Sequence, residues 1–456
     1  MKLTSTNPAS GYKIIGSVEI STTKEINEKV VKANLSKKAW RDIGVKGRVK
    51  LLRQLAKSFV ENRDNFAKLQ SNEMGMPINE SLEDIDYAIE YFNSYLDSST
   101  KYLKPITTKN NKSEHNYVVF EPYGVVACIA PWNYPFTNFV WQCGQNLVAG
   151  NVVIFKHSEE TPLCGKLIEK IVSSKLPDGV FNEIYGDGSV GEYLINQDIN
   201  FICFTGSTKT GIKINKIAAS RLIPTSLELG GSAPGIVCED ADIKSIINTI
   251  YNSRFSNCGQ ACDALKRLIV HKSKYDEIIF ELTDIIKNKK IGDPTNNRTD
   301  IGPLVSKRQL NILEEQINDA TLNGAKIIIG GNKPKNLDGS YFEPTLITNI
   351  TKDMRIWKEE VFGPILPIVI YDTEDQALKL ANDTKFGLGA YVFTKDSKKF
   401  TQIANQLDSG MISQNKLSYV NICNPFTGYK MSGGGHEHAQ FGFNEVTQIK
   451  VIVKEK

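Results

Sequence analysis

Segments of strand length alternate with segments of helical periodicity through the middle of this 456-residue chain. Repeated strand–helix units of this kind specify a parallel sheet that is covered by helices on both faces. In the first block, strands are expected at residues 125–130, 151–156, 181–185 and 201–204, and helices at residues 136–149, 161–174, around 191 and 208–219. A further strand is expected at residues 116–122, ahead of the block.

A second alternating block follows the glycine pair Gly230-Gly231, which permits a tight turn between two domains. Its strands are expected at residues 235–237, 268–270, 325–329 and 365–370, with a helix at 307–322. The first hundred residues have mostly helical periodicity, as at 47–60 and 81–96. A chain of 456 residues favours two or three domains. The expected fold class is therefore α/β, with two Rossmann-like parallel-sheet domains.

Composition excludes several classes of function. A formal net charge of +4 without a long Lys/Arg block argues against nucleic-acid binding. No apolar run is long enough for a membrane span, and the N-terminus lacks the apolar core of a signal peptide, so we expect no membrane partner and a cytoplasmic location. The eight cysteines are scattered and expected to be reduced. No set of Cys and His residues has zinc-site spacing, so no metal is expected.

Three polar motifs fall at the carboxyl ends of expected strands, where open parallel sheets bind ligands. They are Trp132-Asn133, the segment 156–159 with Lys156 and Glu159, and Gly206-Ser207. The last motif opens a helix directly, and the free N–H groups and dipole at a helix N-terminus attract a pyrophosphate. Its spacing is not that of the Gly-x-Gly-x-x-Gly motif, and a plain helix N-cap is the alternative interpretation.

One cysteine is placed for nucleophilic chemistry. Cys262 follows Gly259-Gln260, between an expected helix and an apolar strand, and Glu228 directly precedes the glycine pair. With Asn133, these residues supply a thiol, a carboxylate and an amide donor, which suit a thioester mechanism as nucleophile, base and oxyanion donor. Two alternatives remain open: Cys258 as the nucleophile, and Glu228 as a hinge residue in a salt bridge.

Together these segments resemble the aldehyde dehydrogenase superfamily over nearly the whole chain. The resemblance rests on residues 255–267, 228–231, 131–135, 204–207 and 360–364. It implies the aldehyde dehydrogenase fold, divided into an NAD(P)-binding domain (residues 1–100 and 119–229), a catalytic domain (residues 230–435) and a small β oligomerisation arm (residues 101–118 and 436–456).

The tail at residues 448–456 alternates like a strand but ends the chain. A terminal apolar strand suggests pairing with another subunit, whereas an ordinary edge strand is the alternative. The resemblance favours the first interpretation and implies a homo-oligomer, either a dimer or a tetramer.

The resemblance also implies an NAD cofactor, with NADP possible, and assigns the residues that bind it. Gly206 and Ser207 would lie by the pyrophosphate, and Lys156 and Glu159 by the adenosine ribose. An acid at Glu159 repels a 2′-phosphate, which favours NAD. The remaining members of the cofactor set are Trp132, Glu360 at the nicotinamide ribose and Phe362 near the ring.

The same resemblance implies a reaction. A thiolate at Cys262 adds to an aldehyde, the hemithioacetal gives up hydride to nicotinamide, and water hydrolyses the thioester. Asn133 and the backbone N–H of Cys262 would bind the oxyanion, and Glu228 would activate the water. Relatives that pass the acyl group to coenzyme A generally lack this glutamate, so hydrolysis to the acid is favoured. A non-catalytic structural relative should lack one of the three residues, and all are present.

The expected substrate pocket includes a departure from the family pattern. Asp263 follows the nucleophile, where the family usually carries a small or apolar residue; it either raises the pKa of the thiol or binds substrate hydroxyls. Hydroxyl binding favours small polar aldehydes such as glyceraldehyde, lactaldehyde or glycolaldehyde. A serine at position 232 resembles one subgroup that includes short succinate-semialdehyde dehydrogenases, so succinate semialdehyde stays as the alternative substrate. Arg254 is either an anion-binding residue or part of an interior ion pair. The other expected pocket residues are Asn138, Trp141 and Phe426.

Overall fold

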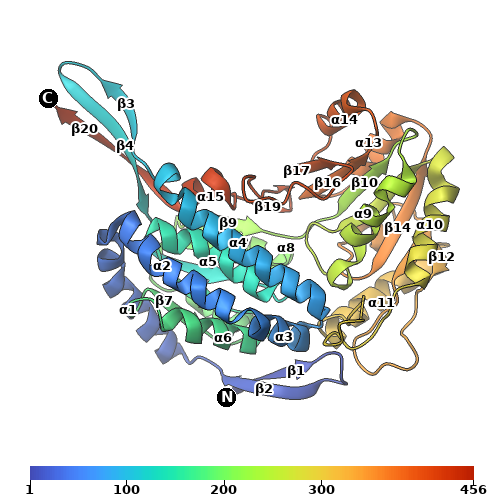
Figure 1. Ribbon diagram of the computed structural model, residues 1–456, viewed down its shortest axis with the longest axis horizontal. Helices are drawn as coiled ribbons and strands as arrows, with labels where there is room; N and C mark the ends of the chain where they lie inside the picture. The colour runs from blue at the N-terminus through green and yellow to red at the C-terminus, as the bar shows by residue number, and fades with distance from the viewer.

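Five parallel strands form the first of two large sheets, with one short antiparallel strand at its edge (Figure 1). The structure is a computed structural model that describes residues 1–456. The strand order is β19-β9-β8-β5-β6-β7. The strands are β5 (Val125–Ile129), β6 (Val152–Lys156), β7 (Phe181–Ile184), β8 (Phe201–Thr205), β9 (Thr225–Glu228) and β19 (Gly433–Gly434).

Helices follow four of these strands, as the alternation predicted. Helix α5 begins with Pro135 in its first turn and ends at Gly150, whose φ of 107° is the left-handed conformation that favours glycine. The expected strand–helix units of the first block are therefore confirmed. The helices of this unit are α1 (Thr23–Asp42), α2 (Gly44–Glu61), α3 (Arg63–Met74), α4 (Ile78–Tyr102), α5 (Pro135–Ala149), α6 (Pro162–Ser173), α7 (Gly188–Ile195) and α8 (Thr208–Ser220).

The second sheet has the order β12-β13-β14-β11-β10-β16-β17 and is parallel except for β12. Its strands are β10 (Ala233–Val237), β11 (Leu265–His271), β12 (Lys326–Ile329), β13 (Thr345–Thr348), β14 (Ile365–Tyr371), β16 (Gly389–Phe393) and β17 (Met411–Gln414). Its helices are α9 (Ile243–Phe255), η1 (Ser256–Gly259), η2 (Lys272–Lys274), α10 (Tyr275–Lys287), α11 (Lys307–Leu322), α12 (Arg355–Lys358), α13 (Glu374–Asn382) and α14 (Ser397–Ala404). The predicted α/β class with two parallel-sheet units is confirmed.

A three-stranded antiparallel ribbon projects from the body (Figure 1). It consists of β3 (Ile106–Asn110), β4 (Glu114–Pro122) and β20 (Thr447–Glu455). The tail strand β20 pairs with β4 of the same chain along its whole length, and its other edge has no partner within the chain. Strand β4 ends at Pro122, as expected for the strand at residues 116–122. Helix α15 (Ala439–Glu445) precedes β20 and packs on α4, α5 and β20.

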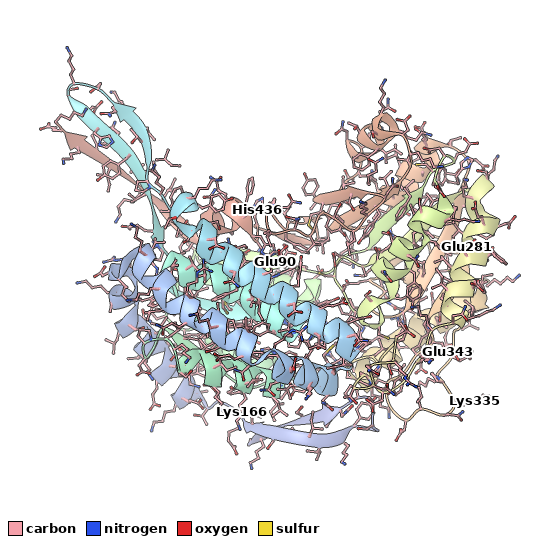
Figure 2. The ribbon with its side chains drawn as sticks, in the orientation of Figure 1. Glu90, Lys166, Glu281, Lys335, Glu343 and His436 are labelled. Atoms are coloured by element: carbon pink, nitrogen blue, oxygen red, sulfur yellow. The ribbon has the colours of Figure 1, made fainter.

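The hairpin of β1 (Lys2–Asn7) and β2 (Lys13–Glu19) was not expected from the sequence, which has mostly helical periodicity in its first hundred residues. A further two-stranded pair joins β15 (Phe386–Gly387) to β18 (Tyr429–Lys430). Charged side chains lie on the outer surfaces, such as Glu90 on α4 and Lys166 on α6 (Figure 2). None of the helices combines the length and the apolar character needed to cross a membrane.

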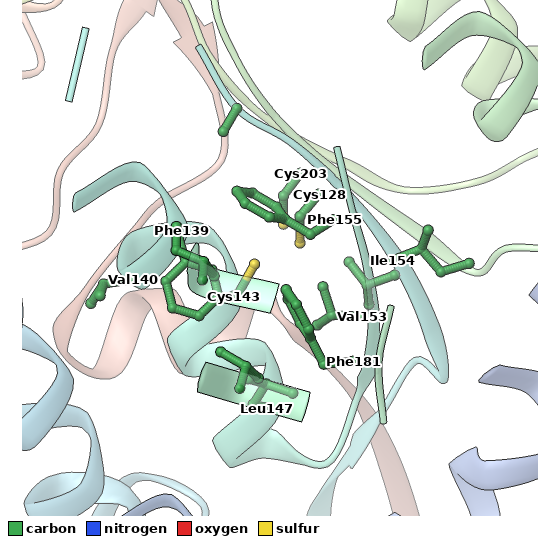
Figure 3. Packing of buried hydrophobic residues seen from close by; sticks show 14 of the residues in the cluster. Cys128, Phe139, Val140, Cys143, Leu147, Val153, Ile154, Phe155, Phe181 and Cys203 are labelled. Carbon is green, nitrogen blue, oxygen red and sulfur yellow. The ribbon is translucent and has the colours of Figure 1, made fainter. Parts of the chain in front are cut away.

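Part of the core of the first unit lies between its sheet and α5 (Figure 3), and the rest includes side chains of α1, α2, α4 and α6. Phe139 on α5 packs edge-on against Phe155 on β6, with ring centroids 5.5 Å apart, and both side chains are fully buried. Burying a side chain of this size stabilises a fold by roughly 1.5–3 kcal/mol. Cys128 and Cys143 are buried in the same cluster, and the eight cysteines of the chain form no disulfide.

Candidate active site

The nucleophile loop (residues 256–264) connects α9 to β11 and carries Cys262. Its backbone is strained at residues 257 and 258. Asn257 and Cys258 have φ values of 50° and 54°, in the left-handed region that non-glycine residues seldom adopt. Gly259 also has a positive φ, of 72°, and a Cβ there would lie 2.5 Å from the Gly363 carbonyl oxygen. Surrounding contacts must hold such a backbone in place.

Residues far away in the sequence provide those contacts. The Glu80 carboxylate on α4 accepts the Asn257 N–H at 2.6 Å. The Gln260 side chain donates to the Asn257 carbonyl at 3.1 Å and accepts the Val305 N–H at 2.9 Å. Burial raises the pKa of Glu80 to about 7, and the Asn257 N–H opposes that rise. The loop is therefore shaped by its surroundings rather than by its own sequence.

Asn133, four residues after the end of β5, points its carboxamide at this loop. The Asn133 Nδ2 donates to the Gln260 backbone carbonyl at 3.1 Å. The backbone carbonyl of Asn133 accepts from Asn257 Nδ2 at 2.8 Å. One N–H of the Asn133 amide remains for another acceptor. The backbone N–H of Cys262 donates to no acceptor in the protein. The loop that carries Cys262 therefore contains one free N–H and is contacted by the Asn133 amide, which has a second; free donors of this kind can bind an oxyanion.

Cys262 and Cys258 differ in accessibility. Cys258 is only 1% exposed and lies in the core of the second unit, whereas Cys262 is partly exposed. Burial raises the pKa of both thiols. For Cys262, the Asp263 carboxylate raises the pKa further, and the Lys266 ammonium lowers it. Accessibility favours Cys262 as the nucleophile.

Glu228 is the last residue of β9, and its backbone is fixed on two sides. Its carbonyl accepts the Gly206 N–H at 2.9 Å, and Gly433 of β19 lies opposite it. The side chain is buried, one carboxylate oxygen has no partner, and no salt bridge engages it. Burial raises the pKa of Glu228 well above its usual range, and the Glu437 and Asp263 charges raise it further. No hydrogen bond joins this carboxylate to Cys262 or Asn133.

The glycine pair after Glu228 has a role other than the expected tight turn. Neither Gly230 nor Gly231 has a positive φ. A Cβ at Gly230 would collide with the Glu360 carboxylate, and a Cβ at Gly231 would collide with the Cys262 carbonyl oxygen. The pair therefore lets the backbone approach the nucleophile and the expected cofactor carboxylate closely.

The expected cofactor residues lie at two places. Trp132 and Phe362 meet edge-on with centroids 5.5 Å apart, and Glu360 accepts the Gly231 N–H at 3.0 Å, close to the nucleophile. Lys156 ends β6, next to β5 in the sheet; it is buried and lies 3.8 Å from the half-exposed Glu159 carboxylate. Gly206 and Ser207 follow β8, and the Ser207 hydroxyl caps α8 by accepting the Thr210 N–H at 3.4 Å.

Two of the expected pocket residues are aromatic and pack together. Trp141 and Phe426 pack with centroids 5.2 Å apart, and both contact the buried His438 ring. Asn138 donates to the Tyr134 carbonyl at 2.9 Å and to Asn133 Oδ1 at 3.4 Å. It is buried and orients Asn133, so its amide is used within the protein.

Asp263 lies among tyrosines. Its backbone carbonyl accepts the Tyr391 hydroxyl at 3.1 Å and the Tyr419 hydroxyl at 3.2 Å. Burial raises the pKa of its carboxyl group, and the Lys266 ammonium opposes that rise.

Arg254 forms no interior ion pair, so that alternative was wrong. It is fully buried, and its Nη2 donates to the carbonyls of Val361 and Gly363. Burial lowers the pKa of this guanidinium to about 9. Arg254 therefore holds the segment that carries Glu360 and Phe362.

The structure adds residues that the sequence reasoning missed. Lys266 contacts Glu360 and the Cys262 carbonyl, and Glu80 anchors the nucleophile loop. Glu437 is paired through its backbone with Phe426, and burial raises the pKa of its carboxyl group to about 8. Lys266 did leave a signal, because it is a charged residue at the start of an otherwise apolar strand. Glu80 and Glu437 left none, since Glu80 acts on Asn257 and Glu437 on the pKa of Glu228, and each of these partners lies more than a hundred positions away.

Comparisons with known proteins agree with this arrangement. The model of the aldehyde dehydrogenase family matches residues 1–452. The chain is 37% identical to aminoaldehyde dehydrogenase 1, peroxisomal, of Pisum sativum, over 98% of this chain and 91% of that protein. It is 33% identical to the NADP(+) succinate-semialdehyde dehydrogenase GabD of Escherichia coli (strain K12), over 98% and 93%. The NAD+ complex of an aldehyde dehydrogenase from Bacillus cereus superposes with a TM-score of 0.96 at 32% identity, covering 100% of this chain and 93% of that one.

Proposed function

Because the chain belongs to the aldehyde dehydrogenase family, we propose that it oxidises an aldehyde to the free carboxylic acid through a thioester on Cys262. The observation that carries this proposal is the pair of donors at the nucleophile loop, the Asn133 amide and the Cys262 backbone N–H. Asn133 contacts the loop that carries Cys262, and the Cys262 thiol is partly exposed. Alternatives with coenzyme A as acceptor or without catalysis are disfavoured because Glu228 and the other two residues are present.

The residues of the chain have distinct tasks in this mechanism. The Cys262 sulfur bonds to the aldehyde carbon, and the oxyanion that forms is bound by Asn133 and the Cys262 N–H. Glu228 takes a proton from the water that cleaves the thioester. A bound nicotinamide dinucleotide supplies the acceptor for the hydride.

The residues at the strand ends fit such a cofactor. Lys156 is buried with a single carbonyl acceptor at 3.1 Å, so its ammonium has hydrogen-bonding capacity left for ribose hydroxyls. Ser207 and Gly206 precede the N-terminus of α8, which suits a pyrophosphate. We assign the dinucleotide to the unit built on β5–β9 and the nucleophile to the unit built on β10–β17. The cofactor is NAD or NADP, with Glu159 favouring NAD.

The proposed substrate is a small polar aldehyde such as glyceraldehyde, lactaldehyde or glycolaldehyde. The Asp263 and Glu437 charges both raise the pKa of Glu228, and Asp263 directly follows the nucleophile. Acids bind hydroxyl groups and repel anions. Succinate semialdehyde is the alternative, supported by the similarity to GabD. Arg254 offers no exposed cation to the carboxylate of this substrate, because the side chain is fully buried; its Nη2 donates to two backbone carbonyls, and its Nε and Nη1 have no partner.

A second candidate is an aldehyde that carries a positive charge. Two observations favour it: the acids just named, and the aromatic wall of Trp141 and Phe426, because cations bind both acids and aromatic faces. The similarity to the aminoaldehyde dehydrogenase of Pisum sativum supports it as well.

We also propose a homo-oligomer that forms through the ribbon. Ile449, Val451 and Val453 on β20 are more than 60% exposed, and the outer edge of β20 is unpaired. A cytoplasmic location stays a prediction, supported by eight cysteines without a disulfide.

One experiment tests the substrate proposal: kcat/KM for glyceraldehyde, lactaldehyde, succinate semialdehyde and 3-aminopropanal, each with NAD and NADP. The matched variant is Asp263→Asn, which keeps the shape and removes the charge. We expect a hydroxy-aldehyde with NAD to give the highest value, and Asp263→Asn to improve succinate semialdehyde relative to the others. A preference of the wild type for succinate semialdehyde would replace the proposed substrate with the alternative.

A further inference from the structure

Lys266 is a buried cation beside the candidate nucleophile. It is the second residue of β11, and its side chain is only 1% exposed. Its ammonium donates to the Cys262 carbonyl at 2.8 Å, to the Gly231 carbonyl at 3.0 Å and to Glu360 Oε1. Three acceptors match the three N–H donors of an ammonium, so the group is fully satisfied.

Glu360 is the other end of this contact. Its Oε1 accepts both the Lys266 ammonium and the Gly231 N–H, whereas its Oε2 accepts no hydrogen bond from the protein. The Lys266 ammonium also lies 5.2 Å from the centroid of the Phe362 ring. One carboxylate oxygen is thus used to fix Glu360, and the other stays free for a ligand.

We propose that Lys266 is a positioning residue that fixes Glu360 relative to the loop of Cys262. The ribose-binding carboxylate and the thiol then keep a constant distance and orientation. The proposal rests on the proposed function, in which Glu360 contacts the nicotinamide ribose. It goes further by assigning a task to Lys266, which in this proposal binds neither the aldehyde nor the nicotinamide ring directly. Hydride transfer depends on the distance and angle between the two bound reactants, so this tie affects rate as well as affinity.

The charge of Lys266 has a second effect at the same place. Asp263 and burial both raise the pKa of the Cys262 thiol, and Lys266 is the cation that lowers it. Without this cation, a smaller fraction of the thiol is ionised at neutral pH. An arginine would not substitute, because its planar fork does not match three acceptors that converge on one nitrogen.

The test uses full-length Lys266→Met, which removes charge and donors, and Lys266→Gln, which keeps amide donors for the two carbonyls. Lys266→Arg tests the geometry. The matched control is Lys272→Met, which removes the same charge at an exposed lysine paired only with Asp372. Two readouts need no turnover: NAD binding measured by calorimetry, and the pH profile of iodoacetamide labelling of the Cys262 peptide, followed by mass spectrometry because Cys423 is also exposed.

We expect Lys266→Met and Lys266→Gln to bind NAD about tenfold more weakly, as for the loss of a charged hydrogen bond. Labelling of Cys262 should need a pH about one unit higher. In turnover, KM for NAD should rise while KM for the aldehyde changes little, and Lys266→Arg should resemble the neutral variants in binding. Lys272→Met should match the wild type.

The inference would be overturned by folded Lys266 variants that resemble the wild type in both readouts. In such variants the dissociation constant for NAD, and the rate of Cys262 labelling at each pH, would stay within twofold of the wild-type values. A lower melting temperature with those two readouts unchanged would also overturn it, because the lysine would then serve only the fold. A wild-type protein that binds NAD but oxidises no aldehyde would contradict the proposed function instead, and the binding and labelling readouts would still decide the role of Lys266.

Discussion

The turn before α8 and the loop before β11 both supply groups to the candidate site, yet they are held in opposite ways. Ser207 has ordinary extended angles and caps its own helix through a residue three positions away. The loop has two non-glycine residues with positive φ and is held by partners 43 to 177 positions away. The first is a local structure that tolerates change, and the second is a strained structure that depends on the whole fold.

This difference predicts where substitutions do most damage. Groups that touch the reacting atoms come first, then the remote anchors of the loop, and the local turn comes last.

The largest effect is expected for Cys262→Ala, which removes the nucleophile. Turnover should fall by roughly five to six powers of ten, while NAD binding stays near that of the wild type. Rapid measurement of NADH formation, together with calorimetry, checks this. Cys258→Ala is the matched control and should keep most activity; if the two variants exchange behaviour, the nucleophile is Cys258.

Glu228→Gln should trap the thioester. The expected result is a burst of NADH followed by turnover ~10²–10⁴-fold slower, because the water loses its base. Burial and nearby acids raise the pKa of Glu228, so in the wild type the base loses its proton only as the pH rises, and kcat should increase with pH above the usual carboxyl range. In Glu228→Gln this rise should disappear; equal steady-state rates would exclude Glu228 from the mechanism.

Asn133→Ala removes one of the two proposed oxyanion donors. We expect kcat to fall by about 10²–10³-fold with little change in NAD affinity. Asn138→Ala, which removes only the group that orients Asn133, should cost less than Asn133→Ala itself. A loss confined to KM for NAD would contradict the oxyanion role.

Glu80→Met tests the remote anchor of the loop. It leaves the buried Asn257 N–H without an acceptor, which should cost about 1–3 kcal/mol in the free energy of unfolding and lower kcat. Glu80→Gln keeps an amide oxygen at the same place and should retain most of the wild-type free energy of unfolding and most of kcat. Urea unfolding and steady-state kinetics measure the pair; equal stability and kcat in the two variants would show that the loop holds itself.

The smallest effect is expected for Ser207→Ala in the local turn. Loss of the N-cap should lower the free energy of unfolding by about 1 kcal/mol and change kcat less than twofold. Denaturant unfolding and kinetics provide the check. A large loss of kcat would mean that the two regions do not differ as described.

The same contrast explains what the sequence revealed. The strand–helix units were predictable because apolar runs, prolines and glycines act within a few residues, and Asn133, Glu228 and Cys262 belong to recognisable short motifs. The β1–β2 hairpin was not predictable, because it is fixed by docking, with the Ser5 hydroxyl donating to the buried Glu73 carboxylate 68 positions away.

Contacts in the site were harder to foresee than the motifs themselves. The sequence shows that Lys266 is charged within an apolar strand, but its partner Glu360 lies 94 positions further on. Asn138 was expected in the substrate pocket, yet its amide turns back to Tyr134 and Asn133. Direction of a side chain depends on packing, which no local pattern specifies.

The short strand β19 has a consequence for how the chain is made. Ser432 accepts the Leu229 N–H through its carbonyl, donates its hydroxyl to the Gly230 carbonyl, and Gly433 pairs with Glu228. Ser432 and β19 leave the ribosome about two hundred positions after β9, so the sheet edge at β9 has no partner strand for nearly half of the synthesis of the chain. Glu228, the proposed general base, pairs with β19 only when translation is nearly complete.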